Sequence, residues 1–304
     1  MACRRTRACP RSVCKVRVVA WNIRAGGGRR VPAIADQIAR WAPDVVALSE
    51  FRATPPSSDL ARALSGHGLG HQLSTASSGY PGVNALLIAS RWPLARVRLR
   101  AAPSIDSGRW LLARVASPCA ITLGTMHVPN RVTGRKFPFL DAVLGVAHDW
   151  RRGPALLVGD TNSGLIDLDE QVPAFNVEED GWIRGLEAAG WADAFRRLRG
   201  ARRAYTWYSP NGGNGFRIDQ AFVNRALRPR LQSASYAWGA APGGRLRRAP
   251  RHALSDHAAL LLDLDAATPA RTAASELALS GPPAADRSTI GGATSGGRIG
   301  RALR

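Results

Sequence analysis

Short apolar runs alternate along the chain with stretches in which apolar residues recur at helical spacing. The first run, 16–21, is typical of a buried strand, and a glycine cluster follows it. Pro32 is tolerated in the first turn of a helix, and the apolar positions after it keep to one face until Pro43. The same pattern predicts further strands at 45–48, 83–89, 96–100, 110–115, 121–126, 155–158, 216–223, 231–238 and 258–264, and helices at 136–150 and 182–189.

The order of these elements favours mixed sheets. Parallel neighbours need a long crossover, usually a helix, whereas antiparallel neighbours can follow one another directly. The chain contains both kinds of connection, which argues against an all-parallel sheet. We therefore expect an α/β protein in which helices flank mixed sheets.

The two ends of the chain differ in composition from the part between them. Residues 1–14 contain four arginines and the cysteines Cys3, Cys9 and Cys14, and they lack the apolar stretch of a secretory signal. Their cysteine spacing contains no C-x-x-C pair and fits no usual zinc pattern. Residues 266–304 are rich in Ala, Gly, Ser, Thr and Pro. We expect a disordered basic leader at 1–14, one ordered domain at 15–265 and a disordered tail at 266–304.

The chain has a net charge of +20, from 42 Lys and Arg residues against 22 Asp and Glu residues. Lys15 and Lys136 are its two lysines, so nearly all of the positive charge is arginine. Such an excess favours a polyanionic partner such as nucleic acid, although a solvated basic surface explains it equally well. No apolar run is long enough to span a membrane. We expect a cytoplasmic monomer, with no protein partner indicated.

Polar clusters stand at the ends of the apolar strand-like runs. They supply carboxylates, amides and imidazoles, which metal-dependent hydrolysis of a phosphodiester needs because this ester is a poor, negatively charged electrophile. Mg²⁺ takes oxygen ligands and usually only one or two protein carboxylates. Glu50 and Asp256 are therefore the best candidate metal ligands, with Asn22 beside them. The clusters are 21–23, 48–50, 126–130, 159–162, 217–219 and 255–257.

Two further groups in these clusters can carry the chemistry. An imidazole that acts as a base or orients a nucleophile needs a carboxylate to fix its tautomer, and Asp219 is the candidate partner of His257. Asp160 can move a proton or align a water, and Asn162 can stabilise a developing oxyanion by about 3–4 kcal/mol. Taken singly, each residue also suits a plain role, such as a solvated strand end or an Asx turn.

Taken in order, the clusters resemble the endonuclease/exonuclease/phosphatase superfamily, which includes exonuclease III-type AP endonucleases, DNase I, neutral sphingomyelinases and inositol polyphosphate 5-phosphatases. The resemblance covers 15–265 and implies a four-layer α/β/β/α sandwich of two packed mixed sheets, with the site at their shared edge. It implies Mg²⁺ or Mn²⁺ as the cofactor. In that family pattern Asn22, Glu50 and Asp256 surround the metal, Asp160, Asn162 and the Asp219–His257 pair act on water and phosphate, and His127 stabilises phosphate or assists the leaving group.

Details of the motifs point to different branches of this superfamily. His127 departs from exonuclease III, whose equivalent motif carries Tyr, whereas the following 128–130 and the aromatic segment 205–219 follow exonuclease III. Trp207 or Tyr208 can stack on substrate, but we favour core positions for these aromatics, which argues against abasic-site specificity. Arginine clusters precede the motifs at 217–219 and 255–257, and Arg248 is a candidate phosphate contact.

Three functions follow from these expectations. The favoured one is a divalent-metal-dependent phosphodiesterase that cleaves nucleic acid, most simply DNA, as an endonuclease or an exonuclease. The alternative is an enzyme of the same fold that acts on a small phosphate ester or a phospholipid headgroup. A non-catalytic nucleic-acid-binding protein is the third, but it requires a missing catalytic residue, and the clusters lack none.

Overall fold

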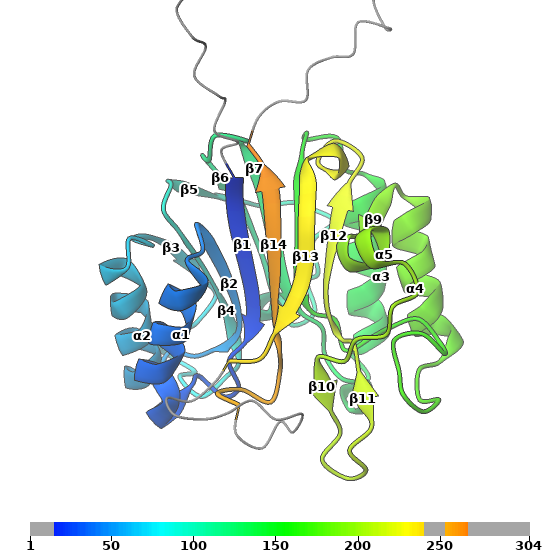
Figure 1. Cartoon of the computed structure of the whole chain (residues 1–304), viewed down its shortest axis with the longest axis horizontal. Coiled ribbons are helices and arrows are strands. Elements are labelled where there is room, and N and C mark those ends of the chain that lie inside the picture. Colours follow the sequence, from blue (N-terminus) through cyan, green and yellow to red (C-terminus); the bar gives the residue numbers. More distant parts are fainter. Residues whose placement is uncertain (1–14, 240–252, 267–304) are drawn as a thin grey trace, which may run out of the picture. The chain divides into compact units, whose positions relative to one another are not determined.

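Two six-stranded sheets pack face to face between two layers of helices (Figure 1). The structure is a computed structural model, and it describes residues 15–239 and 253–266. The expected leader 1–14, the tail from residue 267 onward and the candidate phosphate contact Arg248 lie outside the described residues. The three N-terminal cysteines lie outside them as well.

The first sheet combines one parallel pair with antiparallel pairs. Its strands, in spatial order, are β13 (Leu231–Ala237), β14 (Ala259–Asp265), β1 (Lys15–Asn22), β2 (Val45–Phe51), β4 (Ala85–Ser90) and β3 (His71–Ser74). Strand β1 is parallel to β2, and the other neighbours are antiparallel. The helices α1 (Val31–Trp41) and α2 (Pro55–Gly66) cover the outer face (Figure 1).

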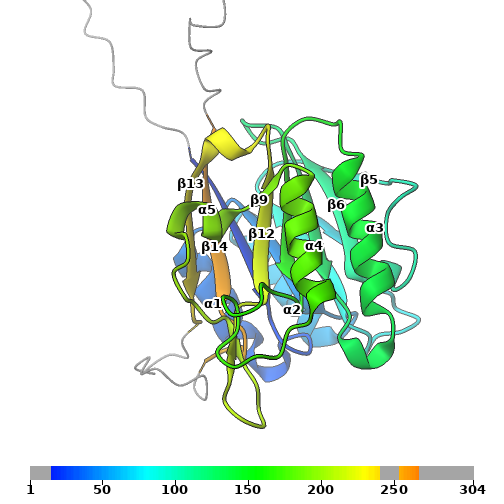
Figure 2. The same cartoon turned by 90° about the vertical axis from the view of Figure 1, so that its right-hand side faces the viewer.

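The second sheet is built in the same way. Its strands, in spatial order, are β5 (Leu94–Val97), β6 (Trp110–Val115), β7 (Ile121–His127), β8 (Ala155–Asp160), β12 (Asp219–Asn224) and β9 (Trp191–Asp193). Strand β7 is parallel to β8. The helices α3 (Lys136–His148) and α4 (Val177–Ala188) lie side by side across its outer face (Figure 2). The short helix α5 (Ala194–Arg199) and the hairpin of β10 (Trp207–Tyr208) and β11 (Gly215–Phe216) complete this half.

Three apolar clusters join the four layers. One lies between the sheets and contains Val18 and Leu123, and a second lies under α3 and α4 and contains Phe139. The third lies under α1 and α2 and contains Ile38 and Leu60. All five side chains are fully buried, and each such burial contributes about 1.5–3 kcal/mol. Strands with apolar residues on both faces are therefore expected here, because both faces of each sheet are covered.

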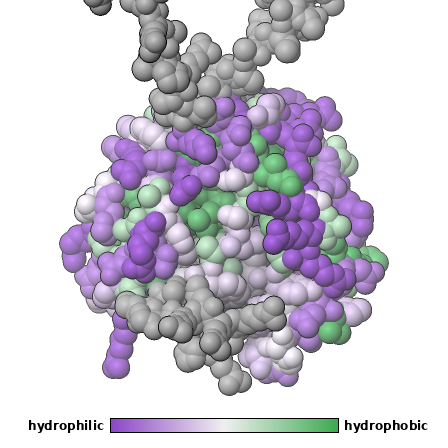
Figure 3. Space-filling model, in the orientation of Figure 1, coloured by the Kyte–Doolittle hydropathy of each residue, from purple (hydrophilic) through white to green (hydrophobic). Residues whose placement is uncertain are grey.

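The surface shows the complementary pattern. On the face that presents β13 and β14, hydrophilic side chains predominate and the apolar patches between them are small (Figure 3). Within the two described ranges, no helix is both long and apolar enough to cross a membrane.

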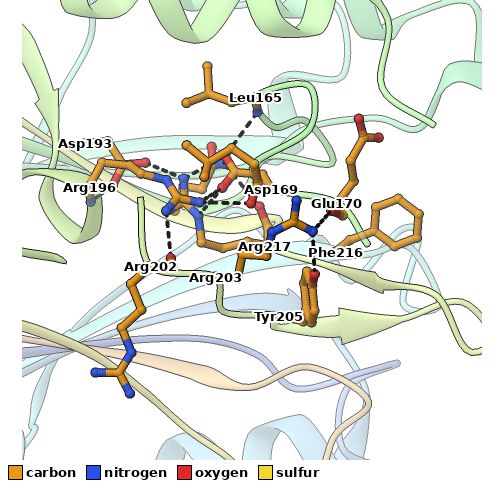
Figure 4. A network of polar contacts seen from close by, with 12 residues as sticks. Leu165, Asp169, Glu170, Asp193, Arg196, Arg202, Arg203, Tyr205, Phe216 and Arg217 are labelled. Carbon is orange, nitrogen blue, oxygen red and sulfur yellow. Dashed lines mark hydrogen bonds and ion pairs between the residues drawn. The ribbon is translucent and has the colours of Figure 1, made fainter. Parts of the chain in front are cut away.

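The observed layers confirm the expected four-layer α/β sandwich with two packed mixed sheets. Locally the sequence prediction was wrong in several ways, and the helix expected at 182–189 is α4, Val177–Ala188. The strand expected at 96–100 is Leu94–Val97, and α2, α5, β3, β9 and β10 were not predicted. The run 216–223 is divided between β11 and β12 because Arg217 leaves the ladder and bonds through its backbone N–H to the Asp169 carbonyl at 2.8 Å. Its charged side chain is fully buried (Figure 4), which periodicity does not reveal.

Candidate active site

The sheet topology gathers the polar clusters at one edge of the sandwich. Strands β1 and β2 are parallel and so are β7 and β8, so that their carboxyl ends lie at this edge (Figure 1). Strands β12 and β14 run antiparallel to their partners β8 and β1, so their amino ends lie there too. In this register Asp160 is the neighbour of His127 on one side and of Asp219 on the other.

A cavity of about 270 Å³ opens at this edge. Seven of the residues that line it were predicted as site residues, namely Glu50, His127, Asp160, Asn162, Trp207, Asp256 and His257. Asn22 and Asp219 lie directly behind this lining through hydrogen bonds to Asp160 and His257. The remaining lining residues, which the sequence did not single out as site residues, are Asn84, Arg109, Asn130, Thr133 and Ile218.

Asn22 ties two carboxylates together at the bottom of the cavity. Its side-chain amide donates to Glu50 Oε1 at 3.2 Å and to Asp160 Oδ2 at 3.1 Å. Its own Oδ1 accepts the backbone N–H of Arg24 at 2.9 Å, and the residue is buried. Because its amide N–H groups and its oxygen all form hydrogen bonds, Asn22 fixes the distance between Glu50 of the first sheet and Asp160 of the second sheet.

Glu50 reaches the cavity through a break in the regular strand. Strand β2 pairs with β4 at Ser49–Leu86 and then at Phe51–Ala85, so Glu50 is the extra residue of a β-bulge. It has a φ of 57°, which is uncommon for a residue with a side chain. Its Oε2 accepts the Ala25 N–H at 2.7 Å. The bulge thus turns a carboxylate into the cavity while Phe51 keeps its place in the core under α1 and α2.

The Asp219–His257 pair is a close and buried contact. His257 Nδ1 lies 2.9 Å from Asp219 Oδ2, and its Nε2 lies 3.8 Å from Asp160 Oδ2. Burial acts to lower the pKa of His257, but the two carboxylates, Asp219 first, outweigh it and raise the pKa to about 10. Trp21 Nε1 donates to the His257 backbone carbonyl at 2.9 Å and holds this segment against the first sheet. The imidazole is therefore doubly protonated at neutral pH, with Nε2–H directed toward Asp160.

His127 approaches the Asp160 carboxylate from the neighbouring strand β7, but its ring is neutral whereas that of His257 is charged. Its Nε2 lies 3.6 Å from Asp160 Oδ2. Burial lowers its pKa to about 4, against the opposing effect of Asp160 and with a further contribution from Arg109. Its Nδ1 is buried and has no hydrogen-bond partner among the residues that the structure describes. At neutral pH the ring is uncharged, so one nitrogen can donate and the other can accept.

Asp160 lies between these two imidazoles at 2% exposure. Burial raises its pKa, and the nearby His257 and His127 only partly offset that effect. Its Oδ1 accepts the backbone N–H of Asn162 at 3.0 Å. A buried carboxylate with a raised pKa, next to one charged and one neutral imidazole, is the arrangement expected for a proton-transfer group.

Asn162 is less free than the sequence suggested. Its side-chain amide donates to the Val128 carbonyl at 2.8 Å, so one of its two N–H groups is already used. Its backbone has a φ of 45°. The remaining N–H is the one that can reach a ligand in the cavity.

A buried ion-pair cluster behind Asn162 was missed in the sequence. Lys136 is 2% exposed, and its Nζ contacts both the Asn162 backbone carbonyl and the Glu179 carboxylate. Glu179 also pairs with Arg131 at 2.6 Å and forms the capping box of α4 with Asn176. Arg131 lies between the lining residues Asn130 and Thr133, and Lys136 contacts the loop of Asn162. The Glu179 carboxylate, which pairs with both cations, therefore anchors both of these loops of the cavity. The Asn176-x-x-Glu179 capping signature was the available signal for this helix start.

The other predicted residues lie at the rim. Asp256 has a side-chain exposure of 38% and lies 3.9 Å from Arg24 Nε. Trp207 is half-buried, its ring centroid lies 6.3 Å from that of His257, and the two residues form a β-bridge. Trp207 therefore forms a wall of the cavity and is not a core residue of either sheet.

The oxygen donors at this edge fit a hard divalent cation. Glu50 and Asp256 supply two carboxylates that open into the cavity, and Mg²⁺ or Mn²⁺ commonly takes no more than this from a protein. The described residues hold no cluster of three or more Asp, Glu, His or Cys side chains in metal-binding geometry. The donor set thus suits an ion that keeps water or substrate oxygens in its other positions, and it does not suit a closed structural zinc site.

Comparison with known proteins agrees with this geometry. A 3′ phosphatase from Neisseria, solved with a product DNA hairpin, has a TM-score of 0.66 and 22% identity and covers 82% of this chain and 99% of its own. A 3′-5′ exonuclease from Neisseria meningitidis has a TM-score of 0.66, 23% identity and coverage of 82% and 100%. An AP endonuclease from Archaeoglobus fulgidus has a TM-score of 0.64, 19% identity and coverage of 82% and 99%. At these identities the likeness establishes the fold.

Sequence comparison adds the family. No curated protein sequence matches the chain significantly. Residues 19–257, however, match the sequence profile of the Endonuclease/Exonuclease/phosphatase family. This match includes strands of both sheets and all of the clusters around the cavity, and it covers most of the chain. The protein therefore belongs to the Endonuclease/Exonuclease/phosphatase family, whose members hydrolyse phosphoester bonds.

Proposed function

We propose that this protein is a divalent-metal-dependent phosphodiesterase that cleaves nucleic acid, most simply DNA. The observation that carries the proposal is the placement of Asp160 between a charged and a neutral imidazole, 3.8 and 3.6 Å away. Hydrolysis of a phosphodiester needs a proton acceptor for the attacking water and donors for the phosphate oxygens. This trio offers both at the bottom of one cavity.

Asp160 takes the role of the base. Its raised pKa makes it a stronger proton acceptor than an exposed carboxylate, and Asn22 and the Asn162 backbone hold it in position. His257 stays protonated because Asp219 holds its Nδ1, and its Nε2–H then donates a charge-assisted hydrogen bond to a phosphate oxygen.

The departing oxygen needs a donor of a different kind. His127 is neutral at physiological pH because burial lowers its pKa to about 4, and as an imidazole it can donate a hydrogen bond to that oxygen. Asn162 adds its free amide N–H to the phosphoryl group. Arg109, half-buried in the 3₁₀ turn immediately before β6, faces the same cavity and supplies positive charge for the phosphate.

The cofactor of this reaction is Mg²⁺ or Mn²⁺, and members of the family generally depend on a divalent metal. Glu50 and Asp256 would hold the ion, with Asn22 orienting Glu50. When bound, such an ion neutralises phosphate charge and polarises the phosphoryl oxygen.

Nucleic acid is the substrate best supported by charge and by the fold relatives. The chain carries a net charge of +20, and an enzyme of similar fold was solved with a product DNA hairpin. The half-buried Trp207 gives the cavity an aromatic wall against which a sugar or base can pack. A small phosphate ester is the second candidate, because the cavity, at about 270 Å³, lies below the roughly 300–1,000 Å³ that is usual for ligand pockets.

The decisive experiment compares three substrates under three metal conditions. Supercoiled plasmid, a DNA hairpin with a 3′-phosphate and a small chromogenic phosphodiester are each incubated with the full chain in Mg²⁺, Mn²⁺ or EDTA. The variant Asp160→Asn is run beside Asp141→Asn, which makes the same change at an exposed residue of α3.

Metal-dependent cleavage of either DNA that is lost in Asp160→Asn and kept in Asp141→Asn supports the proposal. Turnover of the small ester alone assigns the site to small phosphate esters. Absence of hydrolysis with all three substrates contradicts a catalytic function.

A further inference from the structure

A second hollow lies at the opposite edge of the second sheet from the candidate active site. Strands β7 and β8 begin at this edge and end at the candidate active site (Figure 1). The hollow has a volume of about 580 Å³. The residues that line it include Arg114, Cys119, Thr122, Arg152 and Arg230.

Three arginines converge on this hollow from separate parts of the chain. Arg114 comes from β6, Arg152 from the loop between α3 and β8, and Arg230 from the 3₁₀ turn Arg228–Arg230. The side chains of Arg114 and Arg152 are exposed and make no hydrogen bond or ion pair within the described ranges. Arg230 Nη1 donates to the Cys119 carbonyl at 3.0 Å, which fixes the guanidinium at the wall. Its Nε is buried and finds no partner among the described residues.

The lack of a carboxylate partner separates these three arginines from the ion-paired arginines of the protein. Elsewhere in the described ranges nine arginines lie within 4 Å of a carboxylate, and examples are the pairs Arg17–Asp263, Arg62–Asp59, Arg91–Asp44, Arg131–Glu179, Arg135–Asp106, Arg184–Asp180 and Arg217–Asp169. At the hollow, none of the three guanidinium groups contacts a carboxylate of the described chain. The positive charges of the three arginines around the hollow repel one another, and an anion bound between them offsets that repulsion.

We propose that the hollow is a binding site for a phosphate-bearing anion, separate from the candidate active site. Guanidinium forks match phosphate oxygens in geometry as well as in charge. Three guanidinium groups that line one hollow suit an anion with several oxygens better than a single carboxylate. Thr122 lies in the wall of the hollow and is five residues from His127 along β7, roughly 17 Å at the usual rise of a strand. A phosphate held in the hollow therefore cannot be the one that reacts, and this proposal does not rest on the proposed function.

The first test measures binding of inorganic tripolyphosphate to the full chain in EDTA at physiological salt, by calorimetry. The variant Arg114→Gln/Arg152→Gln is compared with Arg40→Gln/Arg225→Gln, which removes the same charge from exposed positions outside the hollow. We expect the affinity of Arg114→Gln/Arg152→Gln for tripolyphosphate to fall on the order of tenfold or more, since each substitution removes a charge-assisted hydrogen bond. The second variant should change affinity by less than about twofold.

Amide NMR spectra of the same samples locate the site. Tripolyphosphate should shift the backbone signals of residues 119–122 and 152–154 in the wild-type and control proteins, and it should leave them unmoved in Arg114→Gln/Arg152→Gln. Equal affinities in the two variants, or no shift at these residues in the wild type, would overturn the proposal.

A single-stranded oligonucleotide distinguishes the source of the phosphate. If its affinity falls in Arg114→Gln/Arg152→Gln but not in the control, the hollow binds a nucleic-acid backbone. If tripolyphosphate binding alone depends on the two arginines, the ligand is a free oligophosphate. Dependence of neither ligand on them contradicts the site.

Discussion

Two carboxylates of this protein, Asp169 and Asp160, are both buried, and their surroundings shift their pKa in opposite directions. Burial acts to raise the pKa of Asp169, but Arg217 reverses this and lowers it. Burial likewise raises the pKa of Asp160, and its imidazole neighbours do not reverse it. The difference lies in the partner: one carboxylate has a permanent cation in contact, whereas the other has groups that can exchange protons.

The network around Arg217 shows what complete pairing looks like (Figure 4). Arg217 is 0% exposed, and its Nε and Nη2 contact the two oxygens of Asp169 at 2.6 and 2.8 Å. Nη2 also contacts Asp193 Oδ2 at 2.7 Å, and Tyr236 Oη accepts from Nη1 at 3.3 Å. Such a network fixes the loop before β12, and in doing so places Asp219 for its contact with His257. The candidate active site retains unmatched groups, and these are the ones available to substrate.

The largest expected effect is on activity. Asp160→Asn should lower kcat by about 10²–10⁴-fold, because it removes the proposed base while keeping the shape of the side chain. The free energy of unfolding should stay constant or rise, since a buried carboxylate is replaced by a neutral group. Turnover assays and denaturant unfolding of the same preparation measure both quantities. Activity within a few-fold of wild type would remove Asp160 from the reaction.

The opposite pattern is expected in the paired network. Arg217→Met should lower the free energy of unfolding by about 3–5 kcal/mol, because Asp169 and Asp193 are left buried without their shared cation. The matched control is Arg62→Met, which breaks an exposed pair with Asp59 and should cost about 0–1 kcal/mol. Urea unfolding of both variants gives the comparison. Similar losses in the two would mean that burial of the network adds nothing.

A third substitution tests the link between structure and site. Lys136→Met removes the contact to the Asn162 carbonyl but leaves Glu179 paired with Arg131. We expect kcat to fall about 10–100-fold with little change in KM, since a positioning contact is lost and no substrate contact is. Lys136→Arg, which restores the charge, should recover part of the rate. An unchanged kcat in the Met variant would show that Asn162 needs no such support.

The smallest effect is a pH dependence of stability. The folded pKa of Asp169 lies below its unfolded value, so its contribution is fully present above the unfolded pKa of about 4. That contribution is lost as pH falls through the folded pKa. Unfolding free energies measured from pH 6 down to pH 3 should therefore decrease more steeply in the wild type than in Asp169→Asn. Parallel curves would indicate that Asp169 does not contribute.

The sequence singled out residues that the structure gathers around one cavity, although it missed several of the local elements around them. Glu50, Asp160 and His257 could be identified because each follows or precedes an apolar strand, and parallel strands bring their carboxyl ends to one edge. The order of those clusters in the chain also pointed to the family. What each group contributes to catalysis stays a prediction.

The parts that were missed depend on contacts between distant segments. Lys136 and Glu179 are far apart in sequence, and each by itself looks like an ordinary charged residue on a helix surface. In the sequence Arg217 looks like an ordinary strand residue. Its burial depends on ion pairs with Asp169 and Asp193, which lie far from it along the chain. Helix α2 begins Pro-Pro-Ser-Ser, which is typical of a loop, and tertiary packing of Leu60 and Leu64 decides its structure.

The bulge at Glu50 has a consequence for how chemistry and scaffold are joined in this protein. Without that residue, Ser49 and Phe51 would be consecutive, and their pairing with Leu86 and Ala85 would be that of an unbroken ladder. Glu50 is thus an insertion into a complete strand, and it belongs to neither apolar face of the sheet. Insertion or deletion of this one residue therefore changes the carboxylates at this edge of the sandwich. The apolar packing on both faces of the sheet does not depend on it.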